Sequence, residues 1–241
     1  MTHAAALEKI TAWLVQLYGP RLQSLVVYGS AAGGNHTHGP HSDLNLLAVL
    51  DTLDAATLDL GAPAIAWWRK QGHPAPVMLS RDEQNDSADI FPIEYLDIQA
   101  HHRVLAGTDL FAQVPRFPEL HRIHVEHDLR SQLLRLRGAY MSHSADAKRL
   151  QALLLDSVST FLTLFRHALA AFGEPLVVDK ERVLAAAAVR FRFSPAPFEA
   201  ILAARRDSAK LAGGKLDALR ALFAEYLAAI TAVERALEQN S

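Results

Sequence analysis

The chain has 241 residues, half of them apolar, with 24 basic and 26 acidic side chains and a net charge of -2. This length is sufficient for one large domain or two small ones, and the apolar content excludes disorder as the main state. The charge balance argues against a strongly basic nucleic-acid-binding protein, and the absence of cysteine excludes disulfides and zinc–thiolate sites. No apolar run approaches the roughly 18 residues of a membrane span, and no secretory signal is visible. We therefore expect a cytoplasmic protein without a membrane partner.

The first 113 residues alternate between helix and strand patterns. Apolar residues at steps of three and four predict amphipathic helices, and short runs rich in β-branched residues predict buried strands. This order favours a mixed sheet with helices packed against it, so the fold class we expect here is α/β (α+β). The predicted strands cover residues 22–28, 44–50, 77–79 and 91–98, and the predicted helices cover residues 7–17 and 53–71.

The remainder of the chain is almost entirely helical in pattern. Pro115 and Pro118 mark the change, so we expect a domain boundary near residue 114 and a helical bundle over residues 114–241. The clearest helix runs from Leu216 to Leu237, with apolar residues at uninterrupted steps of three and four. Such a seam packs inside a bundle or joins two subunits, so a homodimer through this helix is one expected assembly.

One pattern in the first domain is suited to holding a phosphate and a metal ion. The predicted strand 22–28 ends at Gly29 and Ser30, and after a gap of twelve residues Asp43 and Asn45 begin the next strand. Glycine lets the backbone approach a phosphate closely, and the neighbouring amides and the serine hydroxyl can donate hydrogen bonds to it. Alternation along a strand puts Asp43 and Asn45 on one face, where two oxygen-bearing side chains suit a hard cation such as Mg²⁺.

This arrangement resembles the signature of the nucleotidyltransferase superfamily typified by DNA polymerase β. Within it, the closer resemblance is to the small two-domain kanamycin and streptomycin nucleotidyltransferases and to the minimal nucleotidyltransferases. The signature is an apolar strand, Gly-Ser, a gap of about ten residues, an Asp-x-Asp or Asp-x-Glu pair, and a third carboxylate on a later strand. The resemblance covers roughly the first 110 residues. It implies that Gly29 and Ser30 bind a nucleoside triphosphate and that Asp43 carries a Mg²⁺ or Mn²⁺ ion.

Two residues are candidates for the third carboxylate, which would complete the metal site or deprotonate an acceptor hydroxyl. Glu94 lies in the predicted strand 91–98 among apolar neighbours, where a carboxylate needs a reason, and we prefer it. Asp97 is the alternative, although a carboxylate that caps a strand end or turn is the more ordinary interpretation of that residue. The expected catalytic residues are therefore Asp43 and Glu94.

Asn45 stands where the family usually carries its second metal-binding acid. An amide oxygen can ligate Mg²⁺ but brings no charge, so a second cation would be held less tightly. The expected metal ligands are Asp43, Asn45 and Glu94. Our leading interpretation is a Mg-dependent nucleotidyltransferase that uses a nucleoside triphosphate such as ATP and a small hydroxyl-bearing acceptor, because the charge balance disfavours long nucleic acid. The alternative is a non-catalytic nucleotide-binding protein or an antitoxin-like interaction protein.

Histidine is abundant, with twelve in the chain. The histidines of the loop 31–42 and the trio His121, His124 and His127 are conceivable metal ligands. Imidazoles without a carboxylate scaffold, or beside arginines, make weak metal sites. We therefore interpret the loop histidines as solvated and the trio as a half-exposed helix face.

Overall fold

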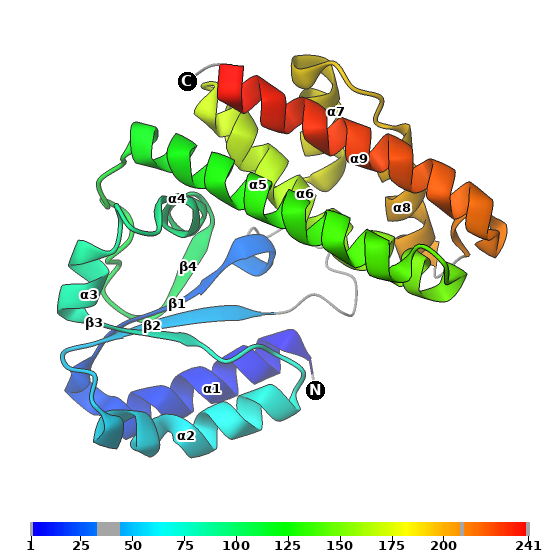
Figure 1. Cartoon of the computed structure of the whole chain (residues 1–241). Coiled ribbons are helices and arrows are strands. Elements are labelled where there is room, and N and C mark those ends of the chain that lie inside the picture. Colours follow the sequence, from blue (N-terminus) through cyan, green and yellow to red (C-terminus); the bar gives the residue numbers. More distant parts are fainter. Residues whose placement is uncertain (1, 33–43, 208–209, 240–241) are drawn as a thin grey trace. The chain divides into compact units, whose positions relative to one another are not determined.

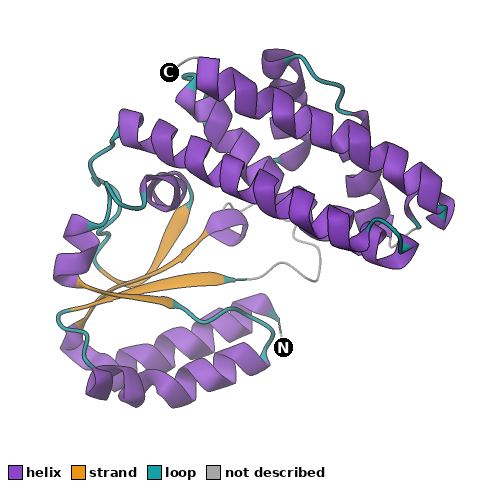
Figure 2. Ribbon diagram, viewed as in Figure 1, coloured by secondary structure: helices purple, strands orange, loops and turns teal. Residues whose placement is uncertain are grey.

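The computed structural model describes residues 2–32, 44–207 and 210–239. The chain forms two compact units, Met1–Phe117 and Pro118–Ser241. The described strands all belong to the first unit, and the described regular elements of the second unit are all helical (Figure 2). The division falls at Pro118, where a long helix begins, a few residues after position 114.

The first unit alternates helices and strands around one sheet. Its elements in chain order are α1 (His3–Tyr18), η1 (Gly19–Arg21), β1 (Leu22–Tyr28), η2 (Gly29–Ala32), β2 (Asn45–Leu50), α2 (Ala55–Lys70), β3 (Val77–Ser80), α3 (Arg81–Asp86), α4 (Pro92–Ala100) and β4 (His102–Gly107). The sheet has the order β3-β2-β1-β4 (Figure 1). Strand β1 pairs antiparallel with β2 and with β4, and β2 pairs parallel with β3. The mixed sheet with flanking helices confirms the predicted fold class.

Helices cover both faces of the sheet, α1 and α2 on one face and α3 and α4 on the other (Figure 1). Alternation along β1 sends Leu25 and Val27 into the core beneath α1 and α2, and Val26 into the core beneath α4. Trp68 of α2 is fully buried in the first core, and Phe111 is fully buried in the second. Each face therefore has its own apolar core, and the polar residues of the sheet gather at the strand ends.

A tyrosine and a glycine set the close packing of α1 against α2. Tyr18, the last residue of α1, is buried and donates a hydrogen bond from its hydroxyl to the carbonyl oxygen of Thr57 at 3.1 Å. A Cβ atom on Gly61 would lie 2.1 Å from that hydroxyl oxygen, far inside van der Waals contact. Glycine at this position in α2 makes room for the tyrosine, at some cost in helix propensity.

The strand predicted at residues 91–98 is wrong, because this segment forms helix α4. Pro92 occupies the first turn of the helix, and Ile93, Tyr95 and Ile98 are its buried apolar side chains. A short apolar run fits a strand or a helix equally well, whereas the fixed φ of proline is preorganised for the first turn of a helix. The strand that completes the sheet, β4, follows directly and was not predicted.

The second unit is a bundle of helices, as predicted. Its elements are α5 (Pro118–His143), α6 (Ala147–Ala171), α7 (Lys180–Phe191), α8 (Ala196–Asp207), η3 (Leu211–Gly214) and α9 (Leu216–Gln239). Helix α6 packs against α5, α7, α8 and α9 and so forms the centre of the bundle. Among the described helices, α6 alone is long and apolar enough to cross a membrane, and half of that apolar window is buried inside the protein.

The apolar seam of α9 is used inside its own unit. Leu219, Phe223 and Tyr226 are buried, and α9 packs against α5 and α6. Phe223 stacks on Tyr140 of α5 with ring centroids 4.0 Å apart, and the Tyr226 hydroxyl lies 3.1 Å from the Ser157 hydroxyl of α6. Neighbouring helices of the same chain therefore cover the seam, which is the first of its two expected uses, and a homodimer through this helix stays a prediction.

One histidine of α5 is buried, contrary to the half-exposed face that we expected. His121 is 3% exposed, and its Nε2 lies 3.0 Å from Nδ1 of His167 on α6. His124 is half-buried and His127 is exposed, so these two agree with the expectation. The histidines of the loop 31–42 lie at positions outside the described residues.

Candidate nucleotide-binding site

Three strand ends meet at one edge of the sheet. Because β1 runs antiparallel to both of its neighbours, its last residue, Tyr28, pairs with Asn45 at the start of β2 and with His102 at the start of β4. Directly paired residues point to the same face of a sheet. The alternation of β2 puts that face toward the core beneath α4. The three side chains therefore lie together where the chain leaves β1.

Gly29 makes the turn that leads out of β1. Its φ of +79° lies in the left-handed region, which glycine adopts without strain. Its N–H donates to the carbonyl oxygen of His101 at 3.0 Å, which ties the turn to the connection between α4 and β4. A Cβ atom here would lie 3.5 Å from Nδ2 of Asn45, an ordinary contact, so conformation rather than space requires glycine. Because the amide of Gly29 is occupied, a phosphate would take its hydrogen bonds from later amides of η2.

Two of the predicted site residues have side chains that lie outside the described part of the chain. Ser30 contributes its backbone to η2, and its hydroxyl lies outside the described part of the chain. Asp43, the predicted catalytic acid and metal ligand, is also outside the described residues. The roles of Gly29, Ser30 and Asp43 therefore stay predictions.

Glu94 comes from a helix rather than from a strand, which corrects its expected placement. It lies in the first turn of α4 and is exposed. Burial raises the pKa of the Tyr28 hydroxyl, and the negative charge of Glu94 raises it further. Glu94 is therefore within electrostatic range of Tyr28, the residue at which the three strand ends meet.

The alternative third acid, Asp97, also lies in α4 and not at a strand end. Its side chain is half-buried, and its backbone carbonyl accepts the N–H of His101 at 2.9 Å at the end of the helix. The structure thus brings Glu94 toward Tyr28 and gives Asp97 a place in the last turn of α4. The preference for Glu94 over Asp97 as a metal ligand stays a prediction.

His102 is held between two hydrogen-bond acceptors. Its Nδ1 lies 2.7 Å from the carbonyl oxygen of Ile98, and its Nε2 lies 2.9 Å from Oδ1 of Asp109. Burial tends to raise the pKa of Asp109, but the hydrogen bonds from His102 and from the N–H groups of Phe111 and Ala112 outweigh it and hold the pKa below its usual range. This pair fixes the start of β4 against α4. No local motif links the two residues, so the sequence offered no signal for it.

Two of the three predicted metal ligands, Asn45 and Glu94, lie in the described part of the chain. Asn45 offers an amide oxygen and Glu94 a carboxylate, both donors that Mg²⁺ accepts. Within the described ranges, no group of three or more His, Cys, Asp or Glu side chains is placed to hold a metal ion. Mg²⁺ or Mn²⁺ therefore remains a prediction that depends on the carboxylate of Asp43.

The helical unit carries a cluster of cations that the sequence analysis missed. Ser159 of α6 accepts a hydrogen bond from Nζ of Lys180 at 3.1 Å and another from the guanidinium of Arg205. Partial burial lowers the pKa of Lys180, and the charges of Arg205 and Arg166 lower it further. Two like charges, from α7 and α8, thus meet at one hydroxyl of α6, which is an arrangement suited to an anion. The cluster could not be found from spacing, because its members lie on three different helices.

Comparisons with known proteins support the fold. No protein-family profile matches the sequence, and no curated protein matches it. Among solved structures, the chain is similar to the spectinomycin adenyltransferase AAD(9) from Enterococcus faecialis, crystallised with ATP and spectinomycin. The identity is 16%, the TM-score is 0.58, and the match covers 93% of this chain and 99% of that chain.

A second similar structure is a mutant of the toxin–antitoxin complex MntA-HpeT. It is 17% identical with a TM-score of 0.30, and the match covers 56% of this chain and 98% of that chain. A TM-score of 0.30 does not establish a common fold. The first likeness extends beyond the sheet into the helical unit, further than the sequence resemblance reached. The chain therefore shares its fold with this adenyltransferase, and its Gly-Ser and Asp-x-Asn pattern resembles that of the nucleotidyltransferase superfamily.

Proposed function

We propose that the chain binds a nucleoside triphosphate at the strand ends around Tyr28 and transfers a nucleoside monophosphate to a small hydroxyl-bearing acceptor. The observation that carries the proposal is the left-handed turn at Gly29 packed against Asn45, at the sheet edge of a nucleotidyltransferase-like fold. A backbone turn without a side chain lets phosphate oxygens approach the backbone amides that follow it.

The proposed reaction is an in-line displacement. The acceptor oxygen attacks the α-phosphorus, the bond from that phosphorus to the oxygen bridging to the β-phosphate breaks, and pyrophosphate leaves. Glu94, whose charge acts on Tyr28, either takes the hydroxyl proton or completes the metal site. Oxygens of Asp43, Asn45 and Glu94 would hold Mg²⁺ or Mn²⁺, which supplies positive charge to the phosphate oxygens when bound. Most of the acceleration in such a reaction comes from positioning and charge stabilisation.

The acceptor is proposed to be small. The similar adenyltransferase was crystallised with ATP and spectinomycin, so this pair is the first to test. The net charge of -2 disfavours a long nucleic acid as acceptor, because such ligands bind through clustered basic residues. Lys180 and Arg205, which meet at the Ser159 hydroxyl of the helical unit, are proposed to bind a phosphate-bearing ligand, since an anion would relieve the repulsion between these two cations.

A non-catalytic nucleotide-binding protein is the second candidate, and Asn45 is the observation that favours it. The amide of Asn45 packs on the turn of Gly29 but adds no negative charge beside the predicted metal ion. A site of this kind could bind a triphosphate without turning it over, as a sensor or as an antitoxin-like partner protein. The two candidates differ in one observable, which is covalent transfer of the α-phosphate.

The deciding experiment incubates the full-length protein with ATP labelled at the α-phosphate, Mg²⁺ or Mn²⁺, and spectinomycin or a panel of small hydroxyl compounds. We expect a labelled acceptor with the natural chain and none with Asp43→Asn. The matched control is Asp89→Asn, which removes an exposed carboxylate from a turn of the same unit and should leave transfer unchanged. Calorimetric titration with ATP in parallel reports binding without turnover.

Asn45→Asp sharpens the distinction. If only the second acid limits the site, this variant should gain transfer activity over the natural chain. Tight ATP binding without any labelled acceptor in either protein, including reactions supplied with cell extract, would contradict the enzyme proposal. That outcome would leave the nucleotide-binding alternative standing.

A further inference from the structure

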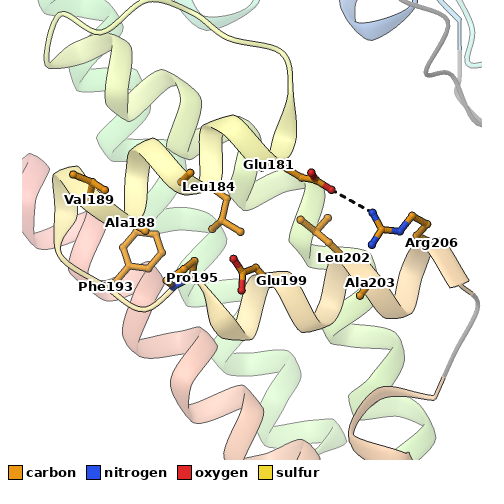
Figure 3. A pocket seen from close by; sticks show the side chains of 11 residues that line it. Glu181, Leu184, Ala188, Val189, Phe193, Pro195, Glu199, Leu202, Ala203 and Arg206 are labelled. Atoms are coloured by element: carbon orange, nitrogen blue, oxygen red, sulfur yellow. Dashed lines mark hydrogen bonds and ion pairs between the residues drawn. The ribbon is translucent and has the colours of Figure 1, made fainter.

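A groove of about 640 Å³ lies between α7 and α8 in the helical unit (Figure 3). Its volume falls within the range of roughly 300–1,000 Å³ that small-molecule sites occupy. Nothing in the proposed nucleotide chemistry uses this groove, because neither Ser159, Lys180 and Arg205 nor any residue of the first unit lines it. It is therefore a separate candidate site.

The walls of the groove are mostly apolar. Leu184 and Ala188 project from α7, and Leu202 and Ala203 project from α8 toward the same space (Figure 3). Two of these four side chains are alanines, which leave volume between the helices that larger residues would fill. Val189 lies at the rim and is 82% exposed, so it extends the apolar surface of the groove toward solvent.

The charges in the groove are unequal. At one end, Oε1 of Glu181 lies 3.2 Å from Nη1 of Arg206, so these two side chains neutralise each other across the helices. Glu199 lies in the first turn of α8, is exposed, and points into the space between the helices (Figure 3). Among the charged residues that line the groove, Glu199 is the one outside the Glu181–Arg206 pair, so the groove presents an exposed carboxylate beside an apolar wall.

We propose that this groove binds a small amphipathic cation, with its apolar body against Leu184, Ala188 and Leu202 and its protonated amine facing Glu199. Charge complementarity decides the class of ligand. The carboxylate of Glu199 would repel an anion, and a neutral compound would gain no charge attraction from it. The volume suits a compact organic amine. A folded protein partner is disfavoured, because a specific protein interface needs a larger contact area than these two short helices expose.

The test uses three probes of one shape: 2-(1-naphthyl)ethylamine, the neutral 2-(1-naphthyl)ethanol and the anion 1-naphthylacetate. Binding to the full-length protein is followed by saturation-transfer NMR and by calorimetry. We expect the amine to bind about two- to fivefold more tightly than the alcohol, the ratio that a solvent-accessible ion pair supplies. The anion should bind most weakly.

Two variants locate the probe. Glu199→Gln should erase the preference for the amine over the alcohol, whereas Glu119→Gln, an exposed carboxylate on α5, should preserve it. Ala203→Phe fills the groove and should weaken both probes at least tenfold, with circular dichroism confirming an unchanged helix content. Equal affinity for amine and alcohol in the natural chain, or binding that Ala203→Phe leaves unchanged, would overturn the proposal. So would a concentration-dependent dimer that Ala203→Phe dissociates, because a second copy would then be the occupant.

Discussion

The backbone N–H of Gly29 donates to the carbonyl oxygen of His101, and this hydrogen bond joins the turn after β1 to the residue before β4. It ties together two loops at this edge of the sheet that are far apart in sequence. It also removes one amide from the set that could face a phosphate. The phosphate-binding amides of the proposed site therefore belong to the residues that follow Gly29.

Replacing Gly29 with alanine tests this turn. An alanine at φ +79° costs about 1–2 kcal/mol of folding free energy, because the left-handed region is strained for a side chain. We expect Gly29→Ala to lower the melting temperature and to weaken ATP binding, as measured by calorimetry. Gly72→Ala is the matched control, since Gly72 has φ +92° and open space around it in a turn that follows α2. It should lower the melting temperature similarly while ATP affinity stays constant; equal losses of affinity would contradict the assignment.

The contact between Gly61 and Tyr18 predicts a non-additive pair of substitutions. Gly61→Ala places a Cβ atom against the Tyr18 hydroxyl and should destabilise the protein by about 1 kcal/mol, after the gain in helix propensity is subtracted. In a Tyr18→Phe background the hydroxyl is absent, so the same substitution should cost less or become favourable. Urea unfolding of the four proteins of the cycle measures the coupling free energy.

Gly138→Ala provides the control for that cycle. Gly138 lies within α5 with no atom near the position of a Cβ, so alanine there should stabilise the helix by up to about 1 kcal/mol. If Gly61→Ala and Gly138→Ala both stabilise the protein, the close approach of Tyr18 does not constrain α2.

The hydrogen bonds to Asp109 predict a pH-dependent contribution to stability. Because the folded-state pKa of Asp109 lies below its ordinary value of about 3.9, its contribution is present above that value and is lost as the pH falls through the lowered pKa. Asp109→Asn should therefore melt at a lower temperature than the natural chain at pH 6, and the difference should shrink toward pH 2. Melting curves across this range check it, with Asp89→Asn as a control that shows no such trend. A difference independent of pH would contradict the argument.

Lys180 is predicted to lower the stability of the ligand-free protein and to strengthen anion binding. Its charge is opposed by burial and by Arg205 and Arg166, so Lys180→Met should slightly raise the melting temperature of the ligand-free protein. The same variant should bind inorganic tripolyphosphate about tenfold less tightly, as expected for loss of a charged donor. Lys215→Met, which removes an exposed lysine of the same unit, should change neither quantity. Unchanged tripolyphosphate affinity in Lys180→Met would remove the anion-binding role.

Elements with uninterrupted patterns were predictable from the sequence. The strand 22–28 is a continuous apolar run closed by Gly29, and α7 begins after Asp179, whose side chain caps it by accepting the N–H of Arg182 at 2.8 Å. The sheet edge that brings Tyr28 and Asn45 together follows from the same strands. The local sequence pattern and the tertiary structure agree at these positions, so the sequence alone predicts these elements.

The elements that escaped prediction depend on partners distant in sequence. The sequence of helix α4 resembles that of a strand because its apolar run is short, and packing of Tyr95 and Ile98 on the sheet, together with Pro92 in the first turn, selects the helix. His121 looks like one of three similar histidines until His167 of α6 is placed against it. The cations around Ser159 come from separate helices, so no spacing rule could assemble them.

Helix α6 is covered by α5, α7, α8 and α9 only while the bundle is folded. Unfolding of the helical unit on heating would expose the buried apolar face of this helix of 25 residues. Exposed segments of this kind associate with one another faster than they find their native neighbours. The protein should therefore inactivate irreversibly on heating, at a rate that rises with protein concentration, and its working lifetime should be governed by how slowly the bundle opens rather than by its equilibrium stability.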